Sequence, residues 1–359
     1  MSDVPEPPMV VRVSAVAPPK KPRPGFWEAC LLTFAYWISL LGLMLAVIVV
    51  ATVWLAVFGD KDDLKVKPGA DPNDMASLPP ALRGAIAWSF PAGYLGGLIF
   101  SLVVLRVVVG RGWTRAIGLR RLPPFHLMLG LLALPGFVVL SDVLAQFVQP
   151  IDALIQRLTG IGSVGDMNET LRVLLQDFHW SFAVFAIGVG PGLVEELWCR
   201  GFLGRGLIGR HGWFMGIALS SMFFGMLHLW PPSYVIVTAV MGACLHFAYV
   251  TSRSLWVPIA MHMMNNSFAA LGSMKVIPTE RMDAAMLVNP TPIIVAAVCV
   301  LLFCGLAMWH SRWTWPGETL GELIPPRGSG IALISTKPDV IYTVASCGFC
   351  AVLIWLLVG

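Results

Sequence analysis

Long apolar runs alternate with short polar segments along most of the chain. Apolar runs of about 18 or more residues are typical of transmembrane helices, because roughly 20 residues at about 1.5 Å each cross the hydrocarbon core. The pattern predicts an all-α, polytopic transmembrane helical bundle with about eight core helices and a ninth, C-terminal span. The predicted spans are 27–58, 82–108, 124–148, 179–199, 212–230, 233–251, 255–273, 291–310 and 340–358.

The segments around these spans divide the chain into predicted regions. Residues 1–25 are basic and rich in proline and have little to bury, so we expect a disordered cytoplasmic tail. Residues 26–310 form the predicted transmembrane domain, in which 149–178 is the longest loop and has mixed polarity. A polar loop at 311–339 and a transmembrane helix at 340–358 are expected to follow.

Composition supports a membrane protein and argues against two other classes. Hydrophobic residues make up 57% of the chain and charged residues 12%, whereas about 25% of the residues of a soluble domain are charged. The formal net charge of +4 is too small to indicate nucleic-acid binding. The seven cysteines lie in or beside apolar runs, so we expect no disulfide framework, and we interpret Cys347 and Cys350 as packing residues.

The distribution of lysine and arginine predicts the orientation in the membrane. These residues gather on the cytoplasmic side of membrane proteins. If the N-terminus is inside, 16 of the 24 lie on the cytoplasmic side and 8 lie outside. We therefore expect an integral multi-pass protein with a cytoplasmic N-terminus, in the plasma membrane if the source is bacterial.

The fourth predicted span contains two adjacent carboxylates, Glu195 and Glu196, followed by Arg200. Ionised carboxylates are costly in hydrocarbon, so intramembrane acids usually face a polar interior. Pro191 lies one turn earlier and is expected to kink the helix, because it lacks a backbone donor. Irregular backbone at membrane depth is tolerated only where protein or a wet cavity covers it. The sequence therefore predicts a cavity at this position.

Helical spacing separates the two acids. Glu196 and Arg200 are four residues apart, so they share one helix face and can form an ion pair. Glu195 points about 100° away from Glu196 on an α-helix. We therefore expect a buried structural pair of Glu196 and Arg200, which leaves Glu195 facing the cavity as a candidate general base.

Two later spans carry histidines that can join these acids. Phe224 lies one turn before His228 and is expected to form a wall on the same face. His262 and Asn266 are four residues apart, so both can address one point. A single intramembrane histidine is more often a packing residue than a catalyst, but these two accompany the acids in neighbouring spans.

Two further polar residues inside spans are given structural roles. His246 is interpreted as a packing residue. Asp142 is a weaker candidate for the polar interior, and we expect it near the outer interface or paired with a neighbour.

The depths of the candidate residues can be compared from the chain length to each turn. If the chain turns near Gly212, Glu195 lies roughly 25 Å back along the helix and His228 roughly 24 Å forward. The two residues are then at one level. His262 lies only about 14 Å from Arg253, so a tilt or a later helix start must supply the difference.

In order and separation, these three polar motifs resemble those of the CPBP family, which comprises the type II CAAX-prenyl endopeptidases and the related Abi proteins. The resemblance covers about residues 180–272, and the ninth predicted helix goes beyond the usual eight. The motifs are Glu195-Glu196-xxx-Arg200, Phe224-xxx-His228 and His262-xxx-Asn266.

The resemblance implies an intramembrane endopeptidase that hydrolyses a peptide bond of a membrane-associated or lipidated substrate. By motif position, Glu195 would activate the attacking water, and His228 would assist it or hold a metal. His262 and Asn266 would stabilise the oxyanion, with a second metal ligand as the alternative role of His262. Glu196 would belong to the catalytic residues and orient the site. Arg200 and Phe224 would have structural or orienting roles.

The residue types leave metal dependence open. Catalytic zinc usually takes three protein ligands and one open position, and His228, His262 and Glu195 could supply the three. The His-Glu-xx-His pattern of soluble zinc peptidases is absent from the sequence. A mechanism without metal, in which Glu195 and His228 polarise water and Asn266 donates to the oxyanion, fits equally well.

Two other functions remain compatible with the same residues. A proton-coupled transporter also uses buried Glu, His and Arg as a proton relay. A non-hydrolytic membrane scaffold or an immunity protein would keep the motifs for stability alone. For the leading hypothesis we expect membrane lipid and a peptide or protein substrate as partners, and the sequence specifies neither prenylation nor the oligomeric state.

Overall fold

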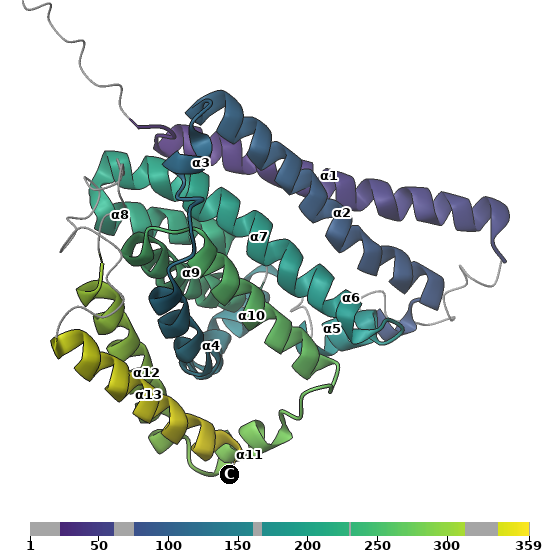
Figure 1. The fold of residues 1–359 in the computed structure, drawn as a ribbon. Helices are drawn as coiled ribbons and strands as arrows, with labels where there is room; N and C mark the ends of the chain where they lie inside the picture. The colour runs from purple at the N-terminus through teal and green to yellow at the C-terminus, as the bar shows by residue number, and fades with distance from the viewer. Residues whose placement is uncertain (1–21, 61–74, 161–166, 230, 313–336, 359) are drawn as a thin grey trace, which may run out of the picture.

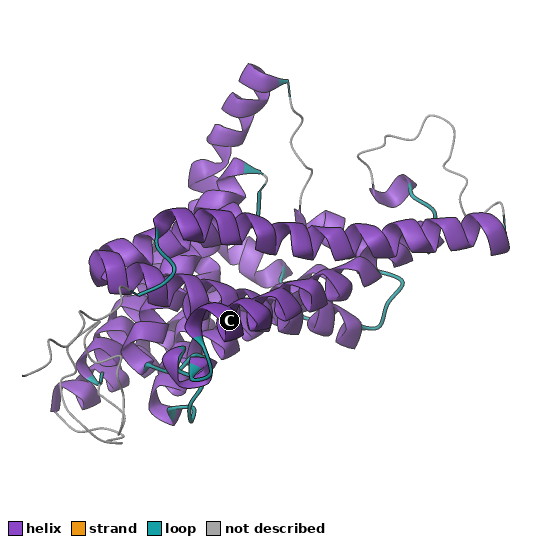
Figure 2. Cartoon of the chain, turned by 90° about the horizontal axis from the view of Figure 1, so that it is seen from above, coloured by secondary structure: helices purple, strands orange, loops and turns teal. Residues whose placement is uncertain are grey.

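The computed structural model consists of helices joined by turns, and the described residues contain no strand (Figures 1 and 2). The predicted all-α, polytopic bundle is confirmed. Most of the predicted tail (1–25) and of the predicted polar loop (311–339) lies outside the described residues. The described residues are 22–60, 75–160, 167–229, 231–312 and 337–358.

Seven helices in the described part of the chain are long and apolar enough to cross a membrane. Four of them, α2, α4, α9 and α12, have proline in the first turn, where the missing backbone donor costs nothing. The seven are Phe26–Phe58 (α1), Pro80–Val109 (α2 and the π-helical turn η3), Pro124–Thr159 (α4), Trp180–Met226 (α6 to α8), Pro232–Ser252 (α9), Pro290–His310 (α12) and Val340–Leu357 (in α13, Lys337–Val358).

A turn at Gly212 explains part of the difference between nine predicted spans and seven observed ones. The predicted spans 179–199 and 212–230 both fall in the single helical run Trp180–Met226. Within that run Gly212 has φ 78° and ψ 167°, a conformation that favours glycine and reverses the chain. The Ser220 hydroxyl donates a hydrogen bond of 2.8 Å to the backbone oxygen of Cys199, so the two arms pack antiparallel. The turn expected near Gly212 is thus confirmed.

Helix α10 (Trp256–Ser273) accounts for the rest of the difference. It covers the predicted span 255–273, but one histidine and two asparagines lower its hydropathy below that of a spanning helix. Its first half is buried among the other helices rather than facing lipid. The polar residues that weaken its membrane signal are those that the sequence marks as candidates for the site.

The predicted loop 149–178 is wrong over most of its length. Helix α4 continues through Pro150 to Thr159, and α5 (Met167–Leu175) follows. The mixed polarity belongs to an amphipathic helix: Val173, Leu174 and Leu175 of α5 are buried, whereas Glu169 is exposed. The extra turns of α4 bring Asp152 to the start of α9, where its carboxylate accepts the backbone N–H of Ser233 at 2.8 Å.

Glycines allow α1 and α2 to lie side by side along one edge of the molecule (Figure 1). A Cβ at Gly96 would collide with the backbone of α1, and one at Gly97 would lie 3.1 Å from the Tyr36 ring. The interpretation of the Gly93-xxx-Gly97 spacing as helix packing is therefore confirmed. The opposite edge consists of α12 and α13, which pack on each other and on α4.

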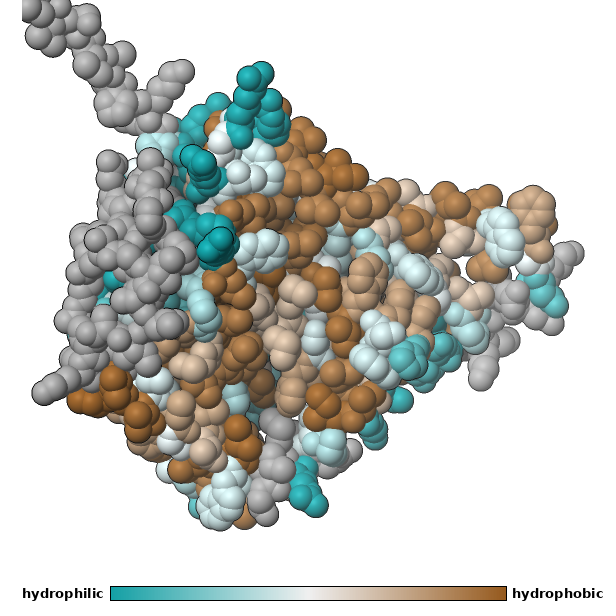
Figure 3. All heavy atoms as spheres, viewed as in Figure 1, coloured by the Kyte–Doolittle hydropathy of each residue, from teal (hydrophilic) through white to brown (hydrophobic). Residues whose placement is uncertain are grey.

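Apolar residues cover much of the face of the molecule that Figure 3 shows. On α1 large hydrophobic residues such as Leu31, Val50 and Phe58 are exposed, as expected for a helix that faces lipid. All seven cysteines are free, in agreement with the sequence analysis. The short elements that complete the described chain are η2 (Met75–Ser77), α3 (Trp113–Ala116) and α11 (Glu280–Val288).

Candidate active site

The acidic motif lies in a short α-helix between two wider helical turns. Helix α7 (Gly190–Glu196) is preceded by the π-helical turn η4 (Val184–Val189) and followed by η5 (Leu197–Gly204). Pro191 occupies the first turn of α7, and the backbone there stays helical. The irregularity predicted at Pro191 therefore takes the form of π-helical turns, which release some intrahelical hydrogen bonds and are frequent at functional sites.

Two glycines on either side of Pro191 let α10 approach the acidic helix closely. A Cβ at Gly188 would collide with Ser267, and one at Gly192 would lie 2.9 Å from the backbone nitrogen of Met263. Both contacts are with α10, so Gly188-xxx-Gly192 is a packing motif, as predicted. Because His262 and Asn266 lie on α10, these glycines bring two candidate site residues to the acidic helix.

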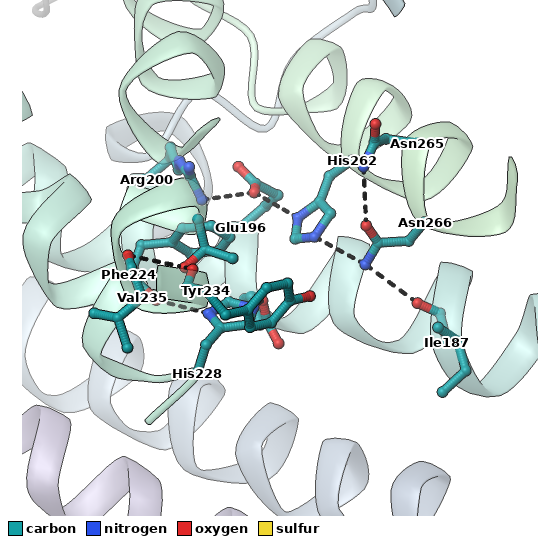
Figure 4. A network of polar contacts seen from close by, with 12 residues as sticks. Ile187, Glu196, Arg200, Phe224, His228, Tyr234, Val235, His262, Asn265 and Asn266 are labelled. Atoms are coloured by element: carbon teal, nitrogen blue, oxygen red, sulfur yellow. Dashed lines mark hydrogen bonds and ion pairs between the residues drawn. The ribbon is translucent and has the colours of Figure 1, made fainter. Parts of the chain in front are cut away.

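Glu196 and Arg200 form the expected buried pair, and His262 joins it (Figure 4). Arg200 Nη1 donates to Glu196 Oε1 at 2.6 Å, and Arg200 Nη2 donates to the Gly242 carbonyl at 2.8 Å. The Arg200 guanidinium also lies 4.3 Å from the centre of the Phe224 ring, a cation–π contact. Glu196 and Arg200 are fully buried, so each charge depends on the other for compensation.

His262 continues this network toward Asn266. Its Nδ1 lies 2.8 Å from Glu196 Oε1, and its Nε2 lies 3.2 Å from Asn266 Nδ2. A carboxylate can only accept, so Nδ1–H donates to Glu196 and the neutral ring offers Nε2 to the Asn266 amide. Asn266 Nδ2 is also 3.3 Å from the Ile187 carbonyl. One chain of contacts therefore runs from Arg200 through Glu196 and His262 to Asn266.

Glu195 takes no part in that chain and faces His228 instead. Its Oε2 is buried without a hydrogen-bond partner among the described residues and lies 4.0 Å from His228 Nε2. His228 Nδ1 is 3.0 Å from the Phe224 carbonyl, which can only accept, so the neutral ring presents an unprotonated Nε2 toward Glu195. Two acceptors about 4 Å apart are suitably spaced for a bridging water, which would donate one hydrogen to each.

Two adjoining cavities meet at His228. The larger has a volume of about 360 Å³ and is lined by His262 and by apolar residues such as Phe137 and Met241. The smaller, of about 240 Å³, is lined by Glu195 and by residues of α1 and α2. A single shared pocket was the simplest expectation, and the structure divides it in two. The residues common to both linings are Leu171, Ile187, His228, Tyr234 and Asn266.

The structure explains how His262 reaches the other site residues, although it lies closer to the turn that precedes its helix. The turn before α10 is buried: Ser254 and Leu255 have no exposed surface, and Leu255 N–H donates to the Gly118 carbonyl at 3.0 Å. The residues around Gly212 at the other turn are exposed. Helix α10 therefore starts deeper in the protein, and His262 reaches Glu196 despite the shorter distance along its helix.

Tyrosines near Glu195 were missed by sequence reasoning. Tyr36 of α1 and Tyr94 of α2 line the smaller cavity with Glu195, and Tyr234 of α9 borders both cavities. The Tyr234 ring centre lies 5.4 Å from that of His228. The only sequence signal was the place of Tyr94 directly after Gly93, inside a small-residue motif already interpreted as packing.

His246 and Asp142, which were assigned structural roles from the sequence, lie in different surroundings. His246 is completely buried, without a hydrogen-bond partner among the described residues, and it lines neither cavity. Asp142 is exposed and lies on the wall of the larger cavity. Asp142 therefore belongs to the surroundings of the site rather than to the buried network.

The three candidate metal ligands do not form a metal site in this conformation. Within the described residues, no three His, Cys, Asp or Glu side chains are grouped so that they could hold a metal ion. Both ring nitrogens of His262 are engaged, one by Glu196 and the other by Asn266. The donor set of His228, His262 and Glu195 thus does not fit the three-ligand arrangement of catalytic zinc.

Comparison with known proteins shows that this region is similar to one protein family. Residues 177–268 match the family described as "Type II CAAX prenyl endopeptidase Rce1-like". The chain is also 28% identical over 189 residues to a Bacillus subtilis (strain 168) protein named "Putative membrane peptidase YdiL", a match that covers 51% of this chain and 70% of that protein. No solved structure matches the chain.

These findings confirm the resemblance to the CPBP, or CAAX protease, family. The matched residues include the acidic motif and both histidine motifs. The comparisons support a membrane protease as the class of protein, and an integral, multi-pass membrane protein agrees with the seven apolar helices. The comparisons do not identify the catalytic residues or the substrate.

Proposed function

We propose that this protein is an intramembrane endopeptidase in which Glu195, acting as a general base, activates water to hydrolyse a peptide bond. The observation that carries the proposal is the pair formed by Glu195 and His228. A buried carboxylate oxygen without a protein partner lies 4.0 Å from an imidazole nitrogen, and both line a cavity. This is the spacing that one bound water requires.

The reaction follows from the groups around that water. The water oxygen bonds to the substrate carbonyl carbon while Glu195 takes one of its protons and His228 Nε2 holds the other hydrogen. A base within hydrogen-bond reach of the proton it removes typically contributes about 10²- to 10⁴-fold. The carbon–nitrogen bond then breaks, and the proton held by Glu195 passes to the leaving amine.

Asn266 is the proposed donor to the oxyanion. Asn266 borders both cavities. Among the described residues, its Nδ2 contacts the Ile187 carbonyl and His262 Nε2, and its Oδ1 accepts from Asn265 Nδ2. An incoming carbonyl oxygen would replace the Ile187 carbonyl or His262 Nε2 as the negative charge develops. A fixed donor at this position lowers the barrier, because the charge appears in a site of low dielectric.

The buried network positions these groups. Glu196 holds the His262 ring, and Arg200 compensates the charge of Glu196. His262 in turn orients the Asn266 amide. In this proposal Glu196 and Arg200 act through His262 and do not touch the substrate, and no step is assigned to a metal.

The two cavities suggest how a substrate lies in the site. They adjoin at His228, Tyr234 and Asn266, which are the residues placed next to the reacting carbonyl. An extended peptide would cross this boundary, with residues on the two sides of the scissile bond in the two cavities. The linings are mainly apolar, so we expect apolar side chains next to the cleaved bond.

Hydrolysis of a quenched fluorogenic peptide library by detergent-purified protein tests the proposal. We expect wild type to release defined peptide products, Glu195→Gln to lose this activity, and His228→Ala to lose most of it. Chelator-treated wild type should keep its activity, with metal content measured on the same sample. The proposal is contradicted if wild type releases no defined products, with or without added metal. It is also contradicted if wild type and Glu195→Gln cleave at equal rates.

A further inference from the structure

Three tyrosines from three helices line the cavity that contains Glu195. They are Tyr36 of α1, Tyr94 of α2 and Tyr234 of α9. Tyr36 is stacked on Trp198 at 4.8 Å between ring centres. The Tyr94 ring packs against the backbone of the acidic helix at Gly190.

The backbone of the acidic helix is shaped for Tyr94. A Cβ at Gly190 would lie 2.8 Å from Tyr94 Cδ2, so only glycine lets the ring lie against α7 at this point. Gly190 precedes Glu195 by five residues, about 7.5 Å along a helix axis, and helical side chains lean back toward the N-terminus. Tyr94 and Glu195 also line the same cavity. The close helix contact therefore brings the Tyr94 ring to the cavity that Glu195 lines.

The two oxygens of Glu195 are in different surroundings. Oε2 faces His228 and has no hydrogen-bond partner among the described residues. A donor on the other oxygen would fix the rotation of the carboxylate and leave Oε2 for the water. Catalytic hydrogen bonds are often long in a site without substrate and shorten when the substrate binds.

We propose that Tyr94 is a positioning residue that donates its hydroxyl hydrogen to Glu195 Oε1 and thereby aims Oε2 at the attacking water. The inference rests on the proposed function, in which Glu195 is the general base. The phenol stays protonated throughout and exchanges no proton with the substrate. Gly190 is the residue that makes the approach of Tyr94 possible.

Steady-state kinetics with a cleaved peptide is the first test. For Tyr94→Phe we expect kcat to fall about ten- to a hundredfold, as for loss of a hydrogen bond to a charged group, while KM is unchanged. Loss of that bond also favours protonation of the carboxylate, so the acidic limb of the pH–rate profile should move to higher pH. The other titratable groups that face Glu195 are Tyr36, Cys199, His228 and Tyr234.

A matched control separates positioning from folding. Tyr249→Phe removes another buried hydroxyl, which donates to the Ile117 carbonyl at 3.0 Å and lines neither cavity. It should leave kcat and the pH profile unchanged. Gly190→Ala keeps the hydroxyl but displaces the Tyr94 ring, and it should reproduce the kinetic loss and the shifted acidic limb of Tyr94→Phe.

Infrared spectroscopy gives a readout that does not need catalysis. The band of protonated Glu195 is identified by its disappearance in Glu195→Gln, and we expect it at higher frequency in Tyr94→Phe than in wild type. An unchanged band, or a kcat equal to that of wild type, overturns the role of Tyr94 even if wild type cleaves peptides. If the band shifts but the wild-type protein cleaves no peptide, the proposed hydrolase function is wrong, whereas the hydrogen bond from Tyr94 to Glu195 is supported.

Discussion

Glu195 and Glu196 are neighbours in sequence but lie in opposite environments. Glu196 is fully buried, with one oxygen shared by Arg200 and His262. Glu195 lines a cavity, and its Oε2 has no hydrogen-bond partner among the described residues. The rotation of about 100° between adjacent helical residues produces this difference. One helix thus supplies both the structural charge of Glu196 and the charge that we propose to be reactive, that of Glu195, and each can be removed separately.

The largest effect on activity is expected from Glu195→Gln. The substitution removes the proposed base but keeps the size of the side chain, so peptide hydrolysis should fall about 10²- to 10⁴-fold. Stability should be equal or higher, because a buried carboxylate whose Oε2 has no hydrogen-bond partner among the described residues is replaced by a neutral amide. Thermal unfolding in detergent, followed alongside the kinetics, checks both parts. If folded protein is lost in proportion to activity, Glu195 is a structural residue like Glu196, and the proposed difference between the two acids is wrong.

Glu196→Gln is expected to lower stability first and activity only as a consequence, in contrast to Glu195→Gln. It leaves the Arg200 charge buried and uncompensated, and breaking a buried pair from one side typically costs about 3–5 kcal/mol. The yield of folded protein and the unfolding temperature should fall first, with activity following them. The double variant Glu196→Leu, Arg200→Met removes both charges and should recover part of the stability. If it does not, charge compensation is not the reason for the pair.

Asn266→Ala tests the far end of the buried network. Loss of one oxyanion donor costs about 10²- to 10³-fold in kcat in other hydrolases. Stability should change by no more than about 1–3 kcal/mol, because the amide has weak contacts at 3.2–3.3 Å. Retention of full kcat in a folded variant would place the oxyanion elsewhere.

Gly192→Ala tests whether the packing of α10 on α7 holds the two halves of the site together. An added Cβ meets the Met263 backbone, so α10 must shift, and overpacking of this kind typically costs about 1–3 kcal/mol. We expect kcat to fall because His262 and Asn266 move with α10. Gly84→Ala in α2 is the matched control, since nothing lies within 4 Å of its Cβ. It should be neutral or slightly stabilising.

The sequence predicted the parts of the fold that depend on one helix alone. Apolar length identified the spans, and the spacing of four residues identified the pair of Glu196 and Arg200. A turn near Gly212 was expected between the fourth and fifth spans, and it places Glu195 and His228 at one depth. Helix α5 and the end of α4 were missed because amphipathic helix and polar loop have similar composition over short segments.

The parts that could not be predicted depend on contacts between helices. The bond between His262 and Glu196 joins residues 66 positions apart, and it forms because the turn before α10 is buried. The arrangement of two cavities depends on side chains from separate helices, since Tyr234 of α9 and Asn266 of α10 both border each cavity. Tyr94 gave almost no signal, since its role depends on a glycine almost a hundred positions away.

A single-turnover cleavage in water enriched with oxygen-18 tests the central claim most directly. If Glu195 activates water, the new C-terminal carboxylate of the product gains one heavy oxygen in the first turnover, and Glu195 gains none. Mass spectrometry of the product and of the protein fragment that contains Glu195 measures both. Label on Glu195 with none in the first product would show that the carboxylate attacks the substrate itself, and it would contradict the account.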